Sequence, residues 1–293
     1  MAIAEARTAA DRYAARVDAV LAQRTRLRGP QPPGDLFAGL RADHPLMKAE
    51  PRRPLNPNLE IIASYIEAAD VIVDVGGGAG RVSLPLALRC RELINVEPSV
   101  AMGAGFTANA SQAGVSNARL ISSDWLSADS PGGTVSLVNH VTYLTREIVP
   151  FIEKLERAGK RRVIITVSSS PGPASNRVLF GLVYGESEEI VPGHVELVNV
   201  LWEMGILPDI RILPLHVASS LDPAPTREAA ISRVATHFGD QWAFWPPGAE
   251  LEQRLRDMLE GRFDELFAVV PEGFIPRWIT PGREILITWQ PQV

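Results

Sequence analysis

The segment from Val71 to Gly80 places the strongest constraint on what this chain can fold into. Residues 71–75 read Val-Ile-Val-Asp-Val, a short and nearly continuous run of β-branched residues. A run of this kind, without polar alternation, is typical of a strand covered on both faces in a parallel sheet. Glycines follow at once, and we expect a helix to begin near Arg81. Because glycine has no Cβ, the turn between strand and helix can be sharp and can approach a bound molecule closely.

Similar short apolar runs recur along the chain and alternate with helical patterns. Helices are predicted over residues 58–69 and from Ile148 to a C-terminal cap at Gly159. The alternation predicts a doubly wound α/β fold with a seven-stranded, mostly parallel sheet. The other strands are predicted at residues 93–96, 118–121, 135–139, 163–167, 210–215 and 285–289.

Composition limits the classes of function. The chain has 293 residues, a formal net charge of −5 and a pI of about 5.6, so the whole molecule has no general attraction for nucleic acid or anionic lipid. A single cysteine, Cys90, excludes an intrachain disulfide and a zinc site of several thiolates. We find no signal peptide or membrane-spanning run and expect a cytoplasmic protein. The one basic stretch, Arg24 to Arg53, is interpreted as solvated surface or as a contact for an anionic group.

Acidic residues accompany the glycine loop. The dinucleotide fingerprint G-x-G-x-x-G requires its third glycine where Arg81 stands, and the spacing is instead acid-x-G-x-G-x-G from Asp74 onward. Glu97 ends the next predicted strand, where a carboxylate can accept hydrogen bonds from ribose hydroxyls. Asp124 follows the third strand with Trp125 beside it, which combines an acceptor for an exocyclic amine with a flat face for stacking. Together these residues predict a nucleoside-binding site.

On these residues the sequence resembles the class I S-adenosylmethionine-dependent methyltransferases of the small-molecule type. The resemblance covers about residues 55–215 and includes the fourth predicted strand, which ends at Asn139. It implies S-adenosylmethionine as the cofactor, with the glycine loop against the methionine part and ribose, Glu97 at the ribose hydroxyls and Asp124 at the adenine amine. The implied cofactor-binding residues are Asp74, Gly76, Gly77, Gly78, Gly80, Glu97, Pro98, Met102, Asp124, Trp125 and Asn139.

The resemblance also suggests a division of the chain. Residues 1–54 are predicted to form an N-terminal helical cap or lid, residues 55–216 a Rossmann-like cofactor-binding core, and residues 217–293 a helical insertion and the final strand. The first helix, over about residues 3–24, is apolar on one face and is followed by a Gly/Pro connector that would allow it to move as a lid. We favour the lid, and the alternative is that the apolar face of this helix completes the main core.

His140 and Tyr143 are the candidate catalytic residues. His140 follows the fourth strand at the carboxyl edge of the sheet, where open α/β sheets bind ligands, and could act as a general base. Both residues could instead be packed wall residues. His44, His194 and His216 are weaker candidates. No group of residues has metal-site spacing, so no metal is expected.

The sequence therefore predicts a methyltransferase that acts on a small-molecule acceptor by in-line displacement. One alternative is an RNA or protein methyltransferase that docks through residues 24–53, and the other is a non-catalytic binding protein with a methyltransferase-like fold. No DNA or membrane partner is expected, and a homodimer is left open. The acceptor is not identified, although the aromatic cluster from Trp242 to Pro247 either lines its pocket or packs the insertion.

Overall fold

The computed structural model describes residues 8–30, 34–35, 37–40, 44, 46–129, 131–169, 177–216, 223–241, 249–278 and 282–291. Its centre is a seven-stranded sheet in the order β3-β2-β1-β4-β5-β9-β6, in which only β9 runs antiparallel to its neighbours. The predicted doubly wound, mostly parallel sheet is confirmed. The strands are β1 (Val71–Val75), β2 (Glu92–Val96), β3 (Ala118–Ile121), β4 (Gly133–Asn139), β5 (Gly159–Ser168), β6 (Asp209–His216) and β9 (Arg283–Trp289).

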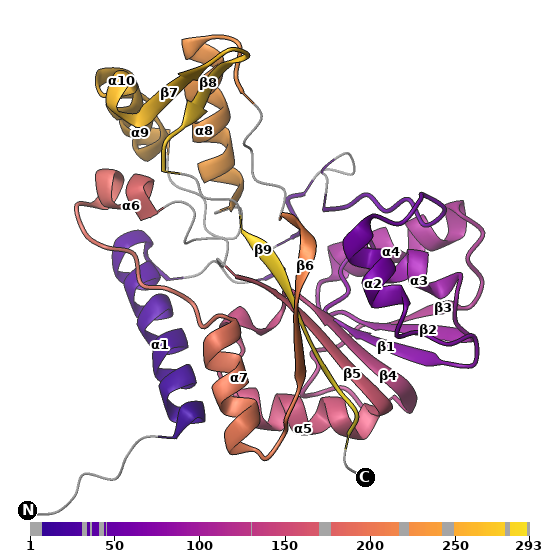
Figure 1. The fold of residues 1–293 in the computed structure, drawn as a ribbon. Helices are drawn as coiled ribbons and strands as arrows, with labels where there is room; N and C mark the ends of the chain where they lie inside the picture. Colours follow the sequence, from indigo (N-terminus) through magenta and orange to yellow (C-terminus); the bar gives the residue numbers. More distant parts are fainter. Residues whose placement is uncertain are drawn as a thin grey trace, which may run out of the picture.

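Helices cover both faces of this sheet (Figure 1). In β1, Val71 and Val73 belong to one hydrophobic cluster and Ile72 belongs to the other. Because both faces are covered, the strand is apolar nearly throughout. One face carries α1 (Ala9–Arg28), α5 (Ile148–Ala158) and α7 (His194–Glu203), and the other carries α2 (Pro57–Ala63), α3 (Ser83–Ala87) and α4 (Val100–Gln112).

The N-terminal helix α1 is packed as a core helix. It begins after Thr8, which forms a capping box with Asp11. Tyr13 and Val17 are fully buried in the same cluster as β1 and α5, and the Tyr13 hydroxyl donates to the carbonyl oxygen of Thr142 at 2.6 Å. Figure 1 shows α1 side by side with α7. The structure therefore differs from the favoured lid and has the second of the two arrangements considered, because the apolar face of α1 is needed to cover the core.

A smaller unit lies beyond the carboxyl ends of the central strands (Figure 1) and has its own hydrophobic cluster. Its elements are α6 (Arg177–Tyr184), α8 (Arg227–Gln241), α9 (Ala249–Gly261), α10 (Phe263–Leu266) and the hairpin of β7 (Phe267–Val270) and β8 (Gly273–Pro276). Phe180 of α6 is buried in one cluster with Leu259 and Phe263. The unit thus includes α6, which precedes the insertion predicted over residues 217–293. The cluster from Trp242 to Pro247 lies outside the described residues.

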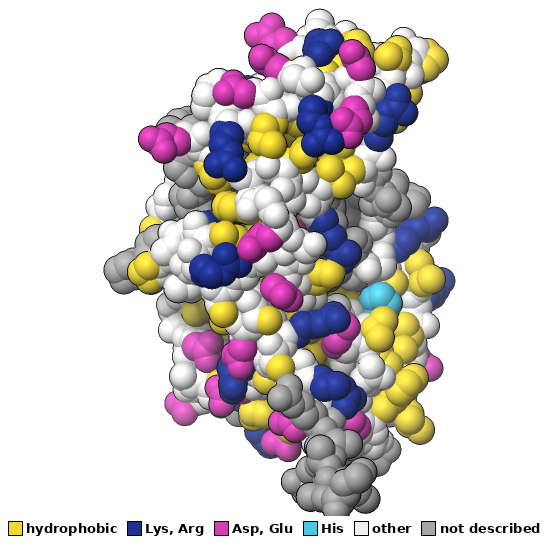
Figure 2. Space-filling view, turned by 90° about the vertical axis from the view of Figure 1, so that its left-hand side faces the viewer, with side chains coloured by type: hydrophobic (Ala, Val, Ile, Leu, Met, Phe, Trp, Pro, Cys, Tyr) yellow, Lys and Arg dark blue, Asp and Glu magenta, His cyan; other side chains and the backbone are white. Residues whose placement is uncertain are grey.

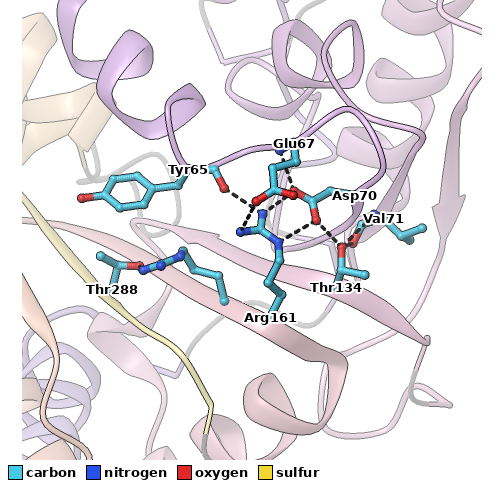
Figure 3. Close-up of polar contacts among 8 residues, drawn as sticks. Tyr65, Glu67, Asp70, Val71, Thr134, Arg161 and Thr288 are labelled. Atoms are coloured by element: carbon cyan, nitrogen blue, oxygen red, sulfur yellow. Dashed lines mark hydrogen bonds and ion pairs between the residues drawn. The ribbon is translucent and has the colours of Figure 1, made fainter.

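An ion-pair network links the amino ends of β1, β4 and β5 (Figure 3). Asp70, just before β1, is 3% exposed. Its Oδ1 accepts from Arg161 Nε at 2.9 Å and from Thr134 Oγ1 at 2.6 Å. Its Oδ2 accepts the N–H of Glu67 at 2.7 Å and a second nitrogen of Arg161. Arg161 also donates to the Tyr65 carbonyl oxygen at 2.8 Å, so the guanidinium joins β5 to the segment that enters β1.

Two features are absent from the described ranges. No helix there is both long enough and apolar enough to cross a membrane. No three His, Cys, Asp or Glu side chains in the same ranges are grouped so that they could hold a metal ion.

Candidate functional site

The glycine loop joins β1 to α3 at the carboxyl edge of the sheet. Gly76 and Gly78 have φ angles of +68° and +55°, in the left-handed region that favours glycine. At Gly77 the constraint is space, because a Cβ there would lie 2.0 Å from Asp74 Oδ2 and 2.6 Å from Asn95 Oδ1. The loop therefore requires glycine for two different reasons, backbone conformation and close approach to buried polar groups.

The amides of this loop are already paired within the chain. The N–H of Gly77 donates to Asn95 Oδ1 at 3.2 Å, and that of Gly78 donates to Glu97 Oε2 at 2.9 Å. In dinucleotide-binding folds, loop amides and the N-terminus of the following helix receive the pyrophosphate. Here α3 has only five residues, and the two amides point to protein acceptors. Both the loop geometry and the absence of a glycine at position 81, which is Arg81, therefore disfavour a pyrophosphate-binding loop.

Asp74 lies directly beneath the loop with an unsatisfied carboxylate. The residue is 1% exposed, and neither oxygen has a hydrogen-bond partner among the described residues. Burial raises the pKa of Asp74 to about 7, and the charge of Glu97 adds to the shift. Ser83 offsets part of it, although its hydroxyl makes no hydrogen bond of ordinary geometry. A buried carboxylate without donors is costly, and such groups concentrate at sites where a ligand binds.

Glu97 ends β2 and supports the loop. It is 5% exposed, and its Oε1 accepts the N–H of Ser99 at 2.8 Å while Oε2 accepts that of Gly78. Burial raises the pKa of Glu97, the two backbone hydrogen bonds oppose the shift, and the charge of Asp35 adds to it. Because each carboxylate oxygen can accept more than one hydrogen bond, Glu97 retains capacity for ligand hydroxyls.

A cleft of about 380 Å³ lies beside Glu97 at the carboxyl ends of β1 and β2. Its volume is within the usual range for small-ligand sites. Met102 lies beneath Gly78, and Asn139 donates to Thr166 Oγ1 at 2.5 Å. These two residues do not line the described walls of the cleft. The predicted cofactor residues that the cleft brings together are Gly76, Glu97, Pro98, Asp124 and Trp125.

Residues before β1 supply a wall of the cleft that the sequence did not predict. Phe37 lines the cleft, and its N–H donates to Asp35 Oδ1 at 3.0 Å. Asp35 Oδ2 accepts from Ser99 Oγ at 3.0 Å and from the N–H of Ala101 at 2.9 Å, which ties the segment to the start of α4. Burial opposes ionisation of Asp35, but these hydrogen bonds outweigh it and hold its pKa below the usual range. No periodicity marks Asp35 or Phe37, so only the tertiary contact reveals them.

Asp124 and Trp125 belong to a loop that is hydrogen-bonded to α5. The exposed Asp124 accepts the N–H of Leu126 at 2.9 Å. Lys154 of α5, 7% exposed, donates to the carbonyl oxygens of Trp125 and Ala128, both at 2.5 Å. Trp125 is 4% exposed, and its indole N–H donates to a backbone carbonyl of α5 at 3.3 Å. Trp125 therefore belongs to the hydrophobic core as well as to the cleft wall, and its predicted role in stacking stays a prediction.

A second polar group lies at the carboxyl end of β4. His140 has a φ of +57°, the one positive φ of a non-glycine residue in the described ranges. Its Nδ1 lies 2.8 Å from Tyr143 Oη, and its Nε2 lies 2.9 Å from Glu284 Oε1. Tyr143 Oη accepts the N–H of Ser168 at 2.6 Å, and Glu284 Oε2 accepts from Asn58 Nδ2 at 2.7 Å. The strained backbone of His140 is thus held by contacts to several elements.

These hydrogen bonds assign the protons of the group. The Glu284 carboxylate can only accept, so the Nε2–H of His140 donates to it. In the neutral imidazole Nδ1 is then an acceptor, and the Tyr143 O–H is its donor. Burial raises the pKa of Tyr143 above its usual range. Burial also opposes ionisation of Glu284, but hydrogen bonds from His140 and Asn58 outweigh it and lower its pKa. The result is a carboxylate that orients an imidazole next to a phenol.

The three side chains are not among the described walls of the cleft, although the adjacent Val141 and Leu144 line it. The sequence predicted His140 and Tyr143 but missed Glu284, which comes from the final strand. Of the weaker histidine candidates, His44 accepts the N–H of Leu46 on Nδ1 at 3.2 Å, and His194 begins α7. The side chain of His216 lies outside the described part of the chain.

Comparisons with known proteins bear on the fold. No protein-family model matches the sequence, and no curated protein matches it. Among solved structures, the YcgJ protein from Bacillus subtilis has a TM-score of 0.52 at 16% identity, over 79% of this chain and 96% of its own. A methyltransferase candidate from Bacillus halodurans C-125 has a TM-score of 0.52 at 14% identity, over 78% of this chain and 95% of its own. This chain therefore has the α/β fold of the class I methyltransferases.

Proposed function

We propose that this protein binds S-adenosylmethionine and transfers its methyl group to a small-molecule acceptor by in-line displacement. The observation that carries the proposal is the acidic character of a site whose loop amides are already occupied. Glu97 and Asp124 line the cleft, and Asp74 lies unpaired beneath the loop. A sulfonium and an ammonium are cations that such a site favours, whereas a pyrophosphate is an anion that it disfavours.

The residues present fit this cofactor group by group. Glu97 would accept hydrogen bonds from the ribose hydroxyls, and Asp124 would accept one from the adenine amine. Phe37 and Pro98 offer apolar walls for the ring. The unsatisfied oxygens of Asp74 would receive a donor, either from the ligand or from a water that it orders. When bound, the cofactor supplies an electrophilic methyl group, and the chain aligns it with the acceptor and excludes water.

We assign the proton chemistry to Tyr143, His140 and Glu284. Where the acceptor loses a proton during transfer, Tyr143 Oη would accept that proton and pass its own to His140 Nδ1. Glu284, which holds the opposite nitrogen of the ring at 2.9 Å, would stabilise the imidazolium. The backbone N–H of Ser168 stays bonded to the phenol oxygen throughout and favours its charged form.

The basic stretch gives less support to docking of RNA or a protein. Arg26 is ion-paired with Glu186. Arg52 donates to the carbonyl oxygen of Ala113 at 3.1 Å, and Arg53 donates to that of Arg81 at 3.0 Å. These cations make contacts inside the chain, so the surface they present to a phosphate backbone is reduced.

Calorimetry with S-adenosylhomocysteine and with NAD tests the cofactor. We expect the first to bind and the second not to bind. Glu97→Ala should weaken S-adenosylhomocysteine binding by roughly tenfold or more because it removes a charged acceptor. Glu92→Ala, at the other end of the same strand, is the matched control and should leave the affinity unchanged. Tight binding of NAD without binding of S-adenosylhomocysteine would overturn the proposal in favour of an oxidoreductase.

A turnover assay distinguishes a methyltransferase from a non-catalytic binding protein. Release of S-adenosylhomocysteine is measured with pooled acceptors that carry hydroxyl, amine or thiol groups. We expect release with wild type and a loss of roughly a hundredfold in Tyr143→Phe and His140→Ala, the usual magnitude for general acid–base groups. Release that both variants leave undiminished would contradict the proton chemistry, and cofactor binding without any turnover would favour a binding protein.

A further inference from the structure

Large apolar side chains are exposed together on α7 and on the edge strand β6. Val195 and Trp202 of α7 are each 55% exposed, and Leu207, in the turn that follows, is 81% exposed. On β6, Ile210 is 47% exposed and Ile212 is 64% exposed. Figure 2, which views the side on which α1 and α7 lie, shows apolar side chains gathered at its lower right. Contiguous apolar surface of this kind marks a site of association in soluble proteins.

The apolar face of the sheet continues past the helix that covers it. Ile285 and Ile287 of β9 are buried at 4% and 0% exposure in the cluster that includes α7. Ile212 pairs with Ile285, and Ile210 pairs with Ile287, so all four side chains share one face of the sheet. On this face, the isoleucines of β9 are buried, whereas those of β6 are exposed. The uncovered part of this face belongs to the last strand of the sheet, whose outer edge pairs with no described strand.

The other face of β6 carries a charge pattern that is complementary to itself. Asp209 and Arg211 flank Ile210, and both are exposed. Neither has an ion-pair partner in the part of the chain that the structure describes. By contrast, Arg16 of the neighbouring α1 is ion-paired with Glu196 of α7 at 2.6 Å. An acid and a base two positions apart on an edge strand fit a second copy of the same strand running in the opposite direction.

We propose that this protein forms a homodimer in which the β6 strands of two copies pair in antiparallel about a two-fold axis at Ile210. In this register, Asp209 of each copy lies opposite Arg211 of the other. A register centred on Arg211 would instead place two arginines opposite each other, which is unfavourable. Pro208 and Pro214 lack an N–H and confine the pairing to the residues between them. The two sheets become continuous, and the exposed Ile210 side chains of the two copies lie next to each other on the same face.

Sedimentation velocity over a wide range of protein concentration tests the dimer. We expect wild type to dimerise and Ile210→Glu to raise the dimer dissociation constant by roughly a hundredfold, since a charge replaces the central apolar contact. Val269→Glu is the control, because Val269 is 78% exposed on β7, away from the proposed interface. Circular dichroism and the thermal unfolding midpoint, measured on each variant, report that the fold is intact, so the result does not depend on the proposed function.

Charge reversal tests the register. Arg211→Asp places two acids opposite each other and should raise the dissociation constant by roughly tenfold. The double variant Asp209→Arg/Arg211→Asp restores opposite charges across the axis and should return the constant to near the wild-type value. A monomeric wild type, or a dimer that Ile210→Glu leaves intact, would overturn the proposal. A dimer sensitive to Ile210→Glu that the double variant does not restore would overturn the register at Ile210.

Discussion

The two ends of β1 each carry a buried aspartate, and the surroundings of the two carboxylates differ completely. Asp70, at the amino end, is 3% exposed and accepts hydrogen bonds on both oxygens, including those from Arg161. Asp74, toward the carboxyl end, is 1% exposed and has no hydrogen-bond partner among the described residues. Burial opposes ionisation of Asp70, but its hydrogen bonds outweigh it and lower its pKa. Burial raises the pKa of Asp74 to about 7.

The difference is that the chain supplies the partners of the carboxylate at one end of the strand and not at the other. At the amino end the chain itself supplies every partner, and the paired charges hold β1, β4 and β5 in register (Figure 3). At the carboxyl end the chain turns away through the glycine loop, and space is left where α/β sheets bind ligands. A buried carboxylate without a partner lowers stability. We infer that it is retained because a ligand completes it.

The largest expected effect is on stability at the amino end. Asp70→Asn should lower the free energy of unfolding by about 2 to 3 kcal/mol, because it breaks a largely buried ion pair and leaves the Arg161 guanidinium without its main partner. Urea denaturation measures the loss. Glu67→Gln is the control, since its side chain is 68% exposed and its bond to Arg161 is a surface contact, for which about 0.5 kcal/mol is expected. Equal losses in both variants would contradict the larger stabilisation assigned to the Asp70–Arg161 pair.

At the carboxyl end, the same substitution should weaken binding without lowering stability. Asp74→Asn should weaken S-adenosylhomocysteine binding by roughly tenfold because a charged acceptor becomes neutral. The free energy of unfolding should not fall at pH 7, because no hydrogen bond to a described residue is lost and a buried charge is removed. Calorimetry and urea denaturation on one preparation measure both. A destabilisation as large as that of Asp70→Asn would break the comparison.

The pH dependence of stability should have opposite signs at the two ends. The lowered pKa of Asp70 contributes stability above the unfolded value of about 3.9, and this is lost as the pH falls through the folded value. The raised pKa of Asp74 makes a contribution that is present below about pH 4 and declines as the pH rises toward 7. Urea denaturation across this range should show the decline flattened in Asp74→Asn and the acid loss flattened in Asp70→Asn. Superimposable profiles of the two variants would contradict the assignment.

The smallest expected effect concerns the wall that residues before β1 add to the cleft. Phe37→Ala should weaken S-adenosylhomocysteine binding by roughly threefold, since one face of apolar contact is lost. Leu88→Ala is the control, because Leu88 is 43% exposed and is not among the residues that line the cleft. Calorimetry is again the measurement. An unchanged affinity in Phe37→Ala would show that this wall does not touch the ligand.

Most of the central fold was predictable because its signals are local. The apolar run of β1 records that both faces of the strand are covered, and this pattern is visible without knowing which helices cover it. Glu97 and Asp124 were predicted to meet because residues at the carboxyl ends of adjacent parallel strands share one edge of the sheet. Both line one cleft in the structure. Their roles toward a ligand stay predictions until binding is measured.

The missed features depend on partners distant in the sequence. Glu284 reaches His140 only because β9 returns antiparallel beside β5. Phe37 reaches the cleft because Asp35 binds the start of α4. The packing of α1 in the core was missed for the same reason, and a lid was favoured instead: an amphipathic pattern shows that a helix covers apolar surface but does not identify that surface.

By itself, the sequence determined the alternation of strands and helices, the glycine loop that excludes a dinucleotide fingerprint, and the acids that end consecutive strands. These follow from backbone conformation and burial, which each residue records locally. Only the tertiary structure decided that Asp70 is paired and Asp74 is not, although the two side chains are chemically identical. The free energy of a buried charge depends on which donors the rest of the fold brings within about 3 Å, and that set of neighbours is a property of the whole chain.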